Sequence, residues 1–235
     1  MTIEERAVSY LEKDKLLHID MLEAIKRGFA KIMYAGEDGV AMVETKENTQ
    51  YLSVVDEAAG EKLMEFLEPR TSVLVHQKFM LETVVERLQL KGYNECRQFS
   101  YHKPEKLYTP VEGIEIRTLG TEWSSTINKI YHLVDSVEYI TSLVESGVMH
   151  GAFIDNKLAG FIGMHMEGSM GLLEVLPEFQ RRGIGVLLES YMVDWSREQG
   201  FTPYCQVFTD NAASLKLQEK LGLEGSASCV YWVSR

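Results

Sequence analysis

The stretch from Leu172 to Gly200 constrains the fold more than any other part of the sequence. An apolar run from Leu172 to Pro177 leads into a turn with glycines at 183 and 185, and apolar residues at helical spacing follow. The run predicts a buried strand, and the spacing predicts an amphipathic helix that ends at Gly200. A strand that feeds directly into a helix in this way indicates an α/β or α+β fold.

The rest of the chain alternates strands and helices in a similar manner. The first half predicts two short helices within 2–28, strands at 30–34, 40–45 and 51–55, a helix at 57–67, a strand at 72–76, a helix at 80–91 and a strand at 96–101. The second half predicts a strand at 114–118, helices at 123–134 and 137–145, strands at 149–154, 158–166 and 171–176, the helix after Gly183, a strand at 204–208, a helix at 212–221 and a strand at 228–233. The second half repeats the order of the first with one extra strand in front, which predicts two copies of one fold.

Residues 104–112 separate these halves. They contain Pro104 and Pro110 and show little apolar periodicity, which is typical of a linker. We therefore expect an N-terminal domain over 1–103, a linker over 104–112 and a C-terminal domain over 113–235.

Composition narrows the class of protein. The 235 residues are 45% hydrophobic and 25% charged, as in ordinary globular proteins, and the net charge of -11 argues against nonspecific nucleic-acid binding. No apolar run reaches the roughly 20 residues that span a bilayer, and the first residues lack a secretory pattern. Cys96, Cys205 and Cys229 are too widely spaced for a zinc site or a disulfide framework. We expect a cytoplasmic protein without a metal, a nucleic-acid partner or a membrane partner.

The turn between strand and helix has the features of an anion site. Gly183 and Gly185 carry no Cβ atoms, so backbone can approach a phosphate, and the first N–H groups of the helix favour negative charge. Arg181 and Arg182 add positive charge at the same end. Glycines also serve ordinary turns, so the function depends on the context of this turn.

That context resembles the GNAT superfamily of CoA-dependent N-acyltransferases. The signature Gln/Arg-x-x-Gly-x-Gly/Ala is matched by Gln180, Gly183 and Gly185, and a second motif is matched by Asn211 with the run Glu219-Lys220-Leu221-Gly222-Leu223. The resemblance covers about Ile114 to Arg235. Within the superfamily, the run from Leu176 to Gly183 and the N-terminal companion domain look most like the glycine N-acyltransferase-like branch.

The resemblance implies a tandem GNAT-like fold, with mixed, mostly antiparallel sheets flanked by helices and a strand splay at the CoA site near Val175. It implies acetyl-CoA or another acyl-CoA as cosubstrate, with the pyrophosphate on the amides of residues 181–186 and the oxyanion on the N–H of Val175 or Leu176. Asn211 would bind the pantetheine, or would only cap its helix. The implied CoA-binding residues are Val175, Leu176, Gln180, Arg181, Arg182, Gly183, Ile184, Gly185, Val186 and Asn211.

Acyl transfer to an amine also needs a base, and Glu174 is the first candidate because it is the carboxylate within the strand. Glu167 is the second candidate, and His165 is an alternative, each acting directly or through water. Many superfamily members carry a tyrosine seven residues after the asparagine as the acid, whereas this chain has Gln218 there. Tyr204 and Tyr231 are candidate substitutes, although tyrosines in strands more often pack in cores. Alternatively, the thiolate leaves unassisted or takes a proton from water.

The first half lacks the phosphate turn. Residues 51–60 stand in its place with one glycine and two acidic residues, so we expect this half to be degenerate and not to bind CoA. The predicted function is N-acetyl transfer from acetyl-CoA to the amine of a small molecule or amino acid. A CoA-binding regulatory or scaffold protein without catalysis is the alternative, and a homodimer is compatible with the sequence.

Overall fold

The computed structural model describes residues 1–133 and 136–234 and divides the chain into two compact units. Unit 1 comprises residues 1–100, 206–219 and 223–235, and unit 2 comprises residues 101–205 and 220–222. The division differs from the predicted domain boundaries, because the end of the chain clusters with the N-terminal half. The order of elements is the one predicted for both halves. The predicted end of the 123–134 helix lies outside the described residues.

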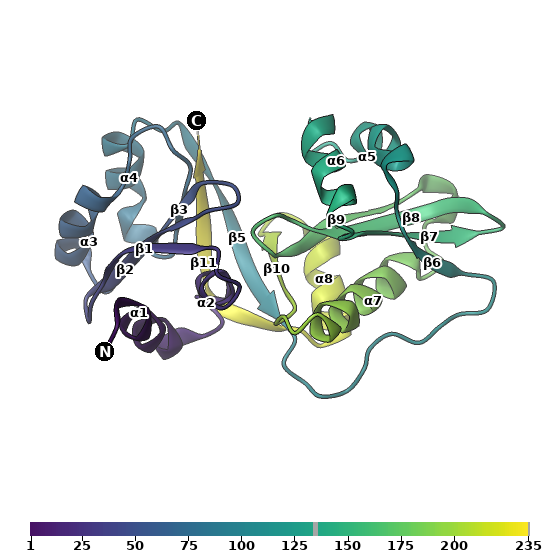
Figure 1. Ribbon diagram of the computed structural model, residues 1–235, viewed down its shortest axis with the longest axis horizontal. Helices are drawn as coiled ribbons and strands as arrows, with labels where there is room; N and C mark the ends of the chain where they lie inside the picture. The colour runs from purple at the N-terminus through teal and green to yellow at the C-terminus, as the bar shows by residue number, and fades with distance from the viewer. Residues whose placement is uncertain (134–135, 235) are drawn as a thin grey trace. The chain divides into compact units, whose positions relative to one another are not determined.

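Unit 1 is a sheet with helices on both faces (Figure 1). Its strand order is β1-β2-β3-β4-β11-β5. Helices α3 and α4 share one core cluster with the strands, and α1 and α2 share the cluster on the other face. Its elements are α1 (Ile3–Leu11), η1 (Glu12–Asp14), α2 (Ile19–Lys26), β1 (Ala30–Ala35), β2 (Gly39–Glu44), β3 (Thr49–Val54), α3 (Glu57–Leu63), η2 (Met64–Phe66), β4 (Val73–Val75), η3 (Lys78–Met80), α4 (Leu81–Arg87), β5 (Gly92–Ser100) and β11 (Glu224–Ser234).

Strand β11 completes unit 1 from the far end of the sequence. It is antiparallel to β4 and to β5, with Tyr231 opposite Val75 on one side and opposite Glu95 on the other (Figure 1). The sheet of unit 1 therefore depends on a strand that the sequence assigns to the C-terminal domain.

Unit 2 has the strand order β9-β8-β7-β6, all antiparallel, with β10 parallel to β9. Helices α5 and α6 pack on one face of this sheet and α7 lies on the other (Figure 1). Its elements are β6 (Glu115–Thr118), η4 (Thr121–Trp123), α5 (Ser124–Ile130), α6 (Val137–Glu145), β7 (Met149–Ile154), β8 (Lys157–Met164), β9 (Met170–Val175), η5 (Pro177–Phe179) and α7 (Ile184–Glu198). Strand β10 (Tyr204–Phe208) and helix α8 (Ala212–Leu221) contribute residues to both units.

Local sequence signals explain several of these boundaries. Thr2 and Glu5 form the expected capping box at the start of α1. The turn between β7 and β8 has Asp155 and Asn156 at φ 49° and 61°, as a type I′ hairpin requires. Gly200, at φ 81°, ends α7 as predicted.

The first half of the predicted linker is docked on α7. The carboxylate of Asp194 accepts hydrogen bonds from the N–H groups of Leu107 (3.0 Å) and Tyr108 (2.8 Å). Arg197 donates to the carbonyl oxygens of Pro104 and Glu105, each at 2.9 Å. Residues 104–108 are thus part of unit 2. Within the described part of the chain, no helix combines the length and apolar character that crossing a bilayer requires.

Candidate functional site

Strand β9 carries a bulge at its centre. Gly171 is opposite Gly163 and Glu174 is opposite Phe161, so β9 advances three residues while β8 advances two. The bulge residue Leu172 has φ 51° and is almost fully buried. This left-handed conformation costs a non-glycine residue about 1 to 2 kcal/mol, so the surrounding structure must hold it.

The edge of β9 beyond the bulge is open. Strands β9 and β10 are in register at one pair, Met170 and Cys205, whereas the equivalent parallel strands of unit 1, β3 and β4, are in register at three pairs. A parallel pair that meets only at its start is the strand splay expected at this position.

The backbone groups at the end of β9 divide between the two edges. The Leu176 N–H donates to the carbonyl oxygen of Ala159 on β8 at 3.0 Å, so it is already used. Because N–H groups alternate along a strand, that of Val175 points to the opposite, open edge. Gln180 covers the neighbouring carbonyl, since its Nε2 donates to the Val175 oxygen at 3.2 Å. Of the two N–H groups predicted to bind the oxyanion, that of Val175 is the one that faces the open edge of β9.

The turn after β9 delivers an uncapped helix N-terminus. The 3-10 helix η5 and Arg181, at φ 61°, bring the chain to Gly183, which is the N-cap of α7 at φ 82°. None of the described side chains caps α7, and the first helical bond runs from the Leu187 N–H to the Gly183 carbonyl. The N–H groups of Ile184, Gly185 and Val186 therefore have no acceptor within the helix.

Space and charge around this N-terminus suit an anion. Among the described residues, no atom outside the chain neighbours of Gly183 lies within 4 Å of the place where a Cβ on Gly183 would stand. A Cβ on Gly185 would be in ordinary contact with the Val175 side chain, at 3.7 Å. Arg181 and Arg182 are exposed, and Arg182 lies over the Phe179 ring at 5.6 Å. Three open N–H groups, a helix dipole and two guanidinium groups make a site for a phosphate.

Glu174 lies on the face of the sheet opposite α7. It is the register partner of Phe161, whose side chain packs with α5 and α6, whereas the Val175 side chain lies beside Gly185 of α7. Burial raises the pKa of the half-buried Glu174 carboxyl, and the nearby His132 offsets part of the effect. A carboxylate with a raised pKa beside an open strand edge has the properties of a general base.

The two other candidate bases are held by hydrogen bonds to neighbouring side chains. Glu167 is 5% exposed and accepts a hydrogen bond from the Ser169 hydroxyl. His165 forms a hydrogen bond of 2.9 Å between its Nδ1 and the Tyr139 hydroxyl, and its ring lies against Gly171 of β9. Both groups belong to unit 2, but the burial of Glu167 favours a structural role.

Asn211 caps its helix. Its Oδ1 accepts a hydrogen bond from the Ser214 N–H at 3.1 Å at the start of α8, which is the simpler of the two predicted roles. The residue is exposed and belongs to unit 1. Its part in binding CoA remains a prediction.

Gln218 and the two tyrosines that are candidate substitutes for the missing acid are buried. Gln218 is 2% exposed in α8. The Tyr204 hydroxyl is fully buried and donates to the Glu167 carbonyl at 3.3 Å, and Tyr231 packs in a core cluster of unit 1. Both tyrosines therefore have packing roles, which are common for tyrosines in strands.

Two residues of this site were not predicted, namely Tyr131 and His132. They follow α5 and lie near Glu174, as their electrostatic interactions with it show. No motif marks them, because they approach Glu174 only in the folded chain.

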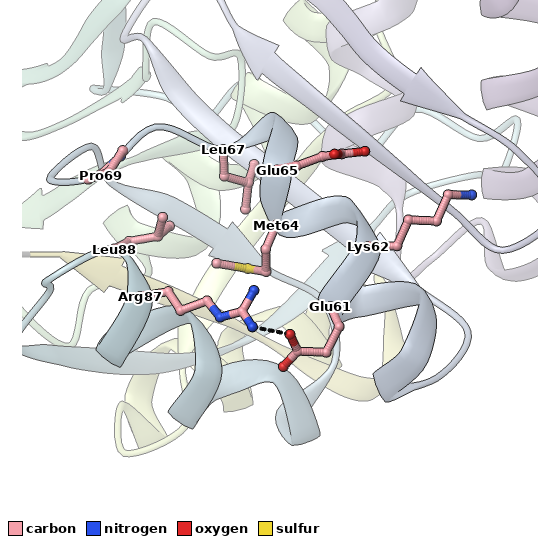
Figure 2. A pocket seen from close by; sticks show the side chains of 8 residues that line it. All are labelled: Glu61, Lys62, Met64, Glu65, Leu67, Pro69, Arg87 and Leu88. Carbon is pink, nitrogen blue, oxygen red and sulfur yellow. Dashed lines mark ion pairs between the residues drawn. The ribbon is translucent and has the colours of Figure 1, made fainter.

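Unit 1 has no counterpart of this anion site among its described residues. Helix α3, which occupies the equivalent place after β3, is capped by the Asp56 side chain. A surface hollow lies between α3 and the end of α4, and the ion pair of Glu61 with Arg87 crosses it (Figure 2). Its charged side chains are of both signs, and the pair is half exposed, so the hollow does not select an anion.

Comparison with known proteins agrees with the geometry. Residues 119–223 match the model of the acetyltransferase (GNAT) family, and no curated protein matches the chain. A Drosophila protein has the same fold over 98% of this chain and 94% of its own, with a TM-score of 0.77 and 16% identity.

Two bacterial structures are similar over nearly the whole chain. A GCN5-related N-acetyltransferase from Kribbella flavida is matched over 93% of this chain and 95% of its own, with a TM-score of 0.61 and 13% identity. A GNAT acetyltransferase from Colwellia psychrerythraea is matched over 97% and 94%, with a TM-score of 0.52 and 17% identity. The family match thus concerns residues 119–223, and the solved structures, which are 13 to 17% identical to this chain, share its fold.

Proposed function

We propose that the protein is an N-acetyltransferase that moves the acetyl group of acetyl-CoA to the amine of a small molecule or amino acid. The observation that carries this proposal is the uncapped N-terminus of α7 at Gly183, directly after the bulged and splayed strand β9. The family match covers this segment and supports acyl transfer from an acyl-CoA.

Acetyl-CoA fits the residues that are present. Its pyrophosphate would be held by the N–H groups of residues 184–186 with Arg181 and Arg182, and Gly183 leaves room for it. Its pantetheine would lie along the open edge of β9. The Val175 N–H would then stabilise the oxyanion that forms when the amine attacks the thioester.

Glu174 would take the proton of the attacking amine. An amine attacks only in its neutral form, so a base that accepts a proton near the operating pH accelerates the reaction. The half-buried Glu174 has a raised pKa and lies on the face opposite α7. The leaving thiolate would depart unassisted or be protonated by water, since Gln218 has no labile proton and is buried.

The proposal is tested by mixing the protein with acetyl-CoA and pools of amines and amino acids while free thiol is followed. Amine-dependent thiol release supports the enzyme. Acetyl-CoA binding by calorimetry without thiol release from any pool supports the second candidate, a CoA-binding regulatory or scaffold protein. That candidate is favoured by one observation, the buried Gln218 at the position where many superfamily members carry tyrosine.

The finer expectations belong to this proposal as well. The run from Leu176 to Gly183 supports a place in the glycine N-acyltransferase-like branch, with unit 1 as a degenerate GNAT-like half. A cytoplasmic location, a small-molecule partner rather than a nucleic acid or membrane, and a homodimer are proposals of the same kind.

A further inference from the structure

A histidine ring fills the place of the missing side chain at Gly171 of β9. The position that a Cβ on Gly171 would take lies 2.5 Å from the Nε2 and 2.7 Å from the Cδ2 of His165. Ordinary contacts between carbon atoms are about 3.5 to 4 Å long, so the ring rests directly on the backbone of β9. Gly171 does not have a positive φ, so the glycine provides space here and not an unusual backbone conformation.

Tyr139 holds this ring from α6. Its hydroxyl and the His165 Nδ1 form a hydrogen bond of 2.9 Å, and the two ring centroids are 6.3 Å apart. The backbone of Tyr139 is fixed by the helix cap, since its N–H donates to the Ser136 hydroxyl at 3.1 Å. The His165 N–H donates to the Ser169 carbonyl at 2.8 Å in the turn between β8 and β9. The pair therefore connects the first turn of α6 with the start of β9.

The His165 ring and Glu174 lie on the same face of β9, on either side of the Leu172 bulge. Because Tyr139 belongs to α6, the ring that it holds covers Gly171 on the face where α5 and α6 pack. Glu174 points to this face as well. A shift of β9 before the bulge would change how every later residue of the strand is directed.

We propose that His165, held by Tyr139, is a positioning residue for acyl transfer. Its ring fixes the start of β9, and the bulge that follows then sets the directions of the Glu174 carboxylate and the Val175 N–H. His165 acts through the strand and does not itself take the proton of the amine. This inference rests on the proposed function. The pair lies at the start of β9, whereas the anion site follows its end, so the pair serves turnover and not the binding of the CoA pyrophosphate.

The bond can be removed from either side, by Tyr139→Phe or by His165→Phe, and each variant keeps both aromatic rings. We expect the two variants and the double variant to lose kcat about equally, by about tenfold, since small misplacements of reacting groups have large kinetic effects. The KM for acetyl-CoA should stay within about twofold. Tyr108→Phe removes a hydroxyl elsewhere in unit 2 and is the matched control. A kcat of His165→Phe far below that of Tyr139→Phe would make His165 a base and overturn the positioning role.

Gly171→Ala displaces the ring and leaves both partners of the bond in the chain. Alanine tolerates a backbone without a positive φ, so the added methyl group acts on the His165 ring and not on the strand conformation. We expect kcat to fall about tenfold or more, again with little change in the KM for acetyl-CoA.

The imidazole nitrogen shifts of His165, measured by NMR, test the contacts independently of activity. They should move in Tyr139→Phe and in Gly171→Ala and stay in place in Tyr108→Phe. Unchanged shifts in Tyr139→Phe overturn the inference, and so does a wild-type kcat in that variant. A wild type that transfers no acetyl group overturns the proposed function too, whereas an active wild type with an unaffected Tyr139→Phe overturns this inference alone.

Discussion

The carboxylate of Asp56 accepts a hydrogen bond of 2.8 Å from the backbone N–H of Ala59 and so closes the N-terminus of α3 with a negative charge. The equivalent helix of unit 2, α7, begins at Gly183 without any side-chain cap. An external phosphate that approached α3 would meet the Asp56 carboxylate instead of open N–H groups. The two units therefore differ at the one place where a CoA pyrophosphate would have to bind.

From this difference we predict one CoA site per chain. Isothermal titration with acetyl-CoA should give a stoichiometry near one, and Asp56→Ala should leave it unchanged while lowering the stability of α3 by about 1 kcal/mol. Asp56→Ala removes the cap but supplies neither the glycines nor the basic residues of the unit 2 turn. Two equivalent sites in the wild type would contradict the assignment of unit 1 as degenerate.

The substitution Gly183→Asp would give the N-terminus of α7 an acidic cap like the one that Asp56 gives to α3. Apart from its chain neighbours, a Cβ at this position would meet no atom of the described residues within 4 Å, and Asp and Asn tolerate the left-handed φ better than other residues with side chains do. Asp should cap α7 and keep the fold, yet repel phosphate. We expect its acetyl-CoA Kd to exceed that of the isosteric Gly183→Asn by about tenfold or more. Equal affinities for the two variants would show that phosphate does not bind at this turn.

Glu174→Gln tests the proposed base. The raised pKa of Glu174 means that the carboxyl is protonated, and inactive, at the acidic end of the rate profile. The variant should bind acetyl-CoA normally, lose roughly a hundredfold or more in turnover and lack that acidic limb. Glu145→Gln, at the exposed end of α6, is the control and should behave as the wild type. Unchanged turnover in Glu174→Gln would transfer the role to Glu167, His165 or water.

Because β11 completes the sheet of unit 1, the isolated N-terminal half should not fold on its own. A fragment of residues 1–103 lacks β11, which lies between β4 and β5 and pairs with both. We expect the fragment to give poorly dispersed amide resonances and no cooperative thermal transition. Adding the peptide 223–235 should restore part of the structure. A fragment that folds alone would show that the sheet tolerates the loss of β11.

Sequence patterns predicted the order of the elements and the glycine turn because these depend on local signals. Periodicity marked α7, and Gly183, Gly200 and the Asp155-Asn156 turn all occupy the positive φ values for which their residue types are suited. The destination of β11 was not predictable, because an apolar strand reads the same whichever sheet it joins. The docking of residues 104–108 on α7 likewise depends on Asp194 and Arg197, which lie far away in the sequence.

The sequence likewise predicted some parts of the candidate site and not others. The motif located the turn, and strand alternation placed Glu174 opposite Val175, on the face away from α7. The bulge at Leu172 has no signal in its residue type, since leucine disfavours a positive φ. The choice between the N–H groups of Val175 and Leu176 required the register with β8, which a single sequence does not contain.

The last prediction concerns His150, a buried histidine of β7 that is 1% exposed. Its ring lies 5.1 Å from those of Tyr191 and Trp195 on α7, and its buried Nε2 has no hydrogen-bond partner among the described residues. Burial lowers its pKa from 6.5 to about 4. The unfolded chain therefore takes up a proton as the pH falls below 6.5, whereas the folded chain does so only near pH 4. Stability contributed by the neutral ring is lost across this window.

Phenylalanine at this position fills the same aromatic surroundings and cannot take up a proton. Chemical denaturation at pH 7.5 and 4.5 should show that His150→Phe removes about 2 kcal/mol of the wild-type loss in unfolding free energy between these two pH values. At pH 7.5 the variant should be at least as stable as the wild type, because an unsatisfied buried nitrogen is removed. His102→Gln, at an exposed position, is the control and should keep the wild-type pH dependence. If His150→Phe keeps it as well, the acid sensitivity of the protein arises elsewhere, and His18, whose pKa burial also lowers to about 4, is the next residue to replace.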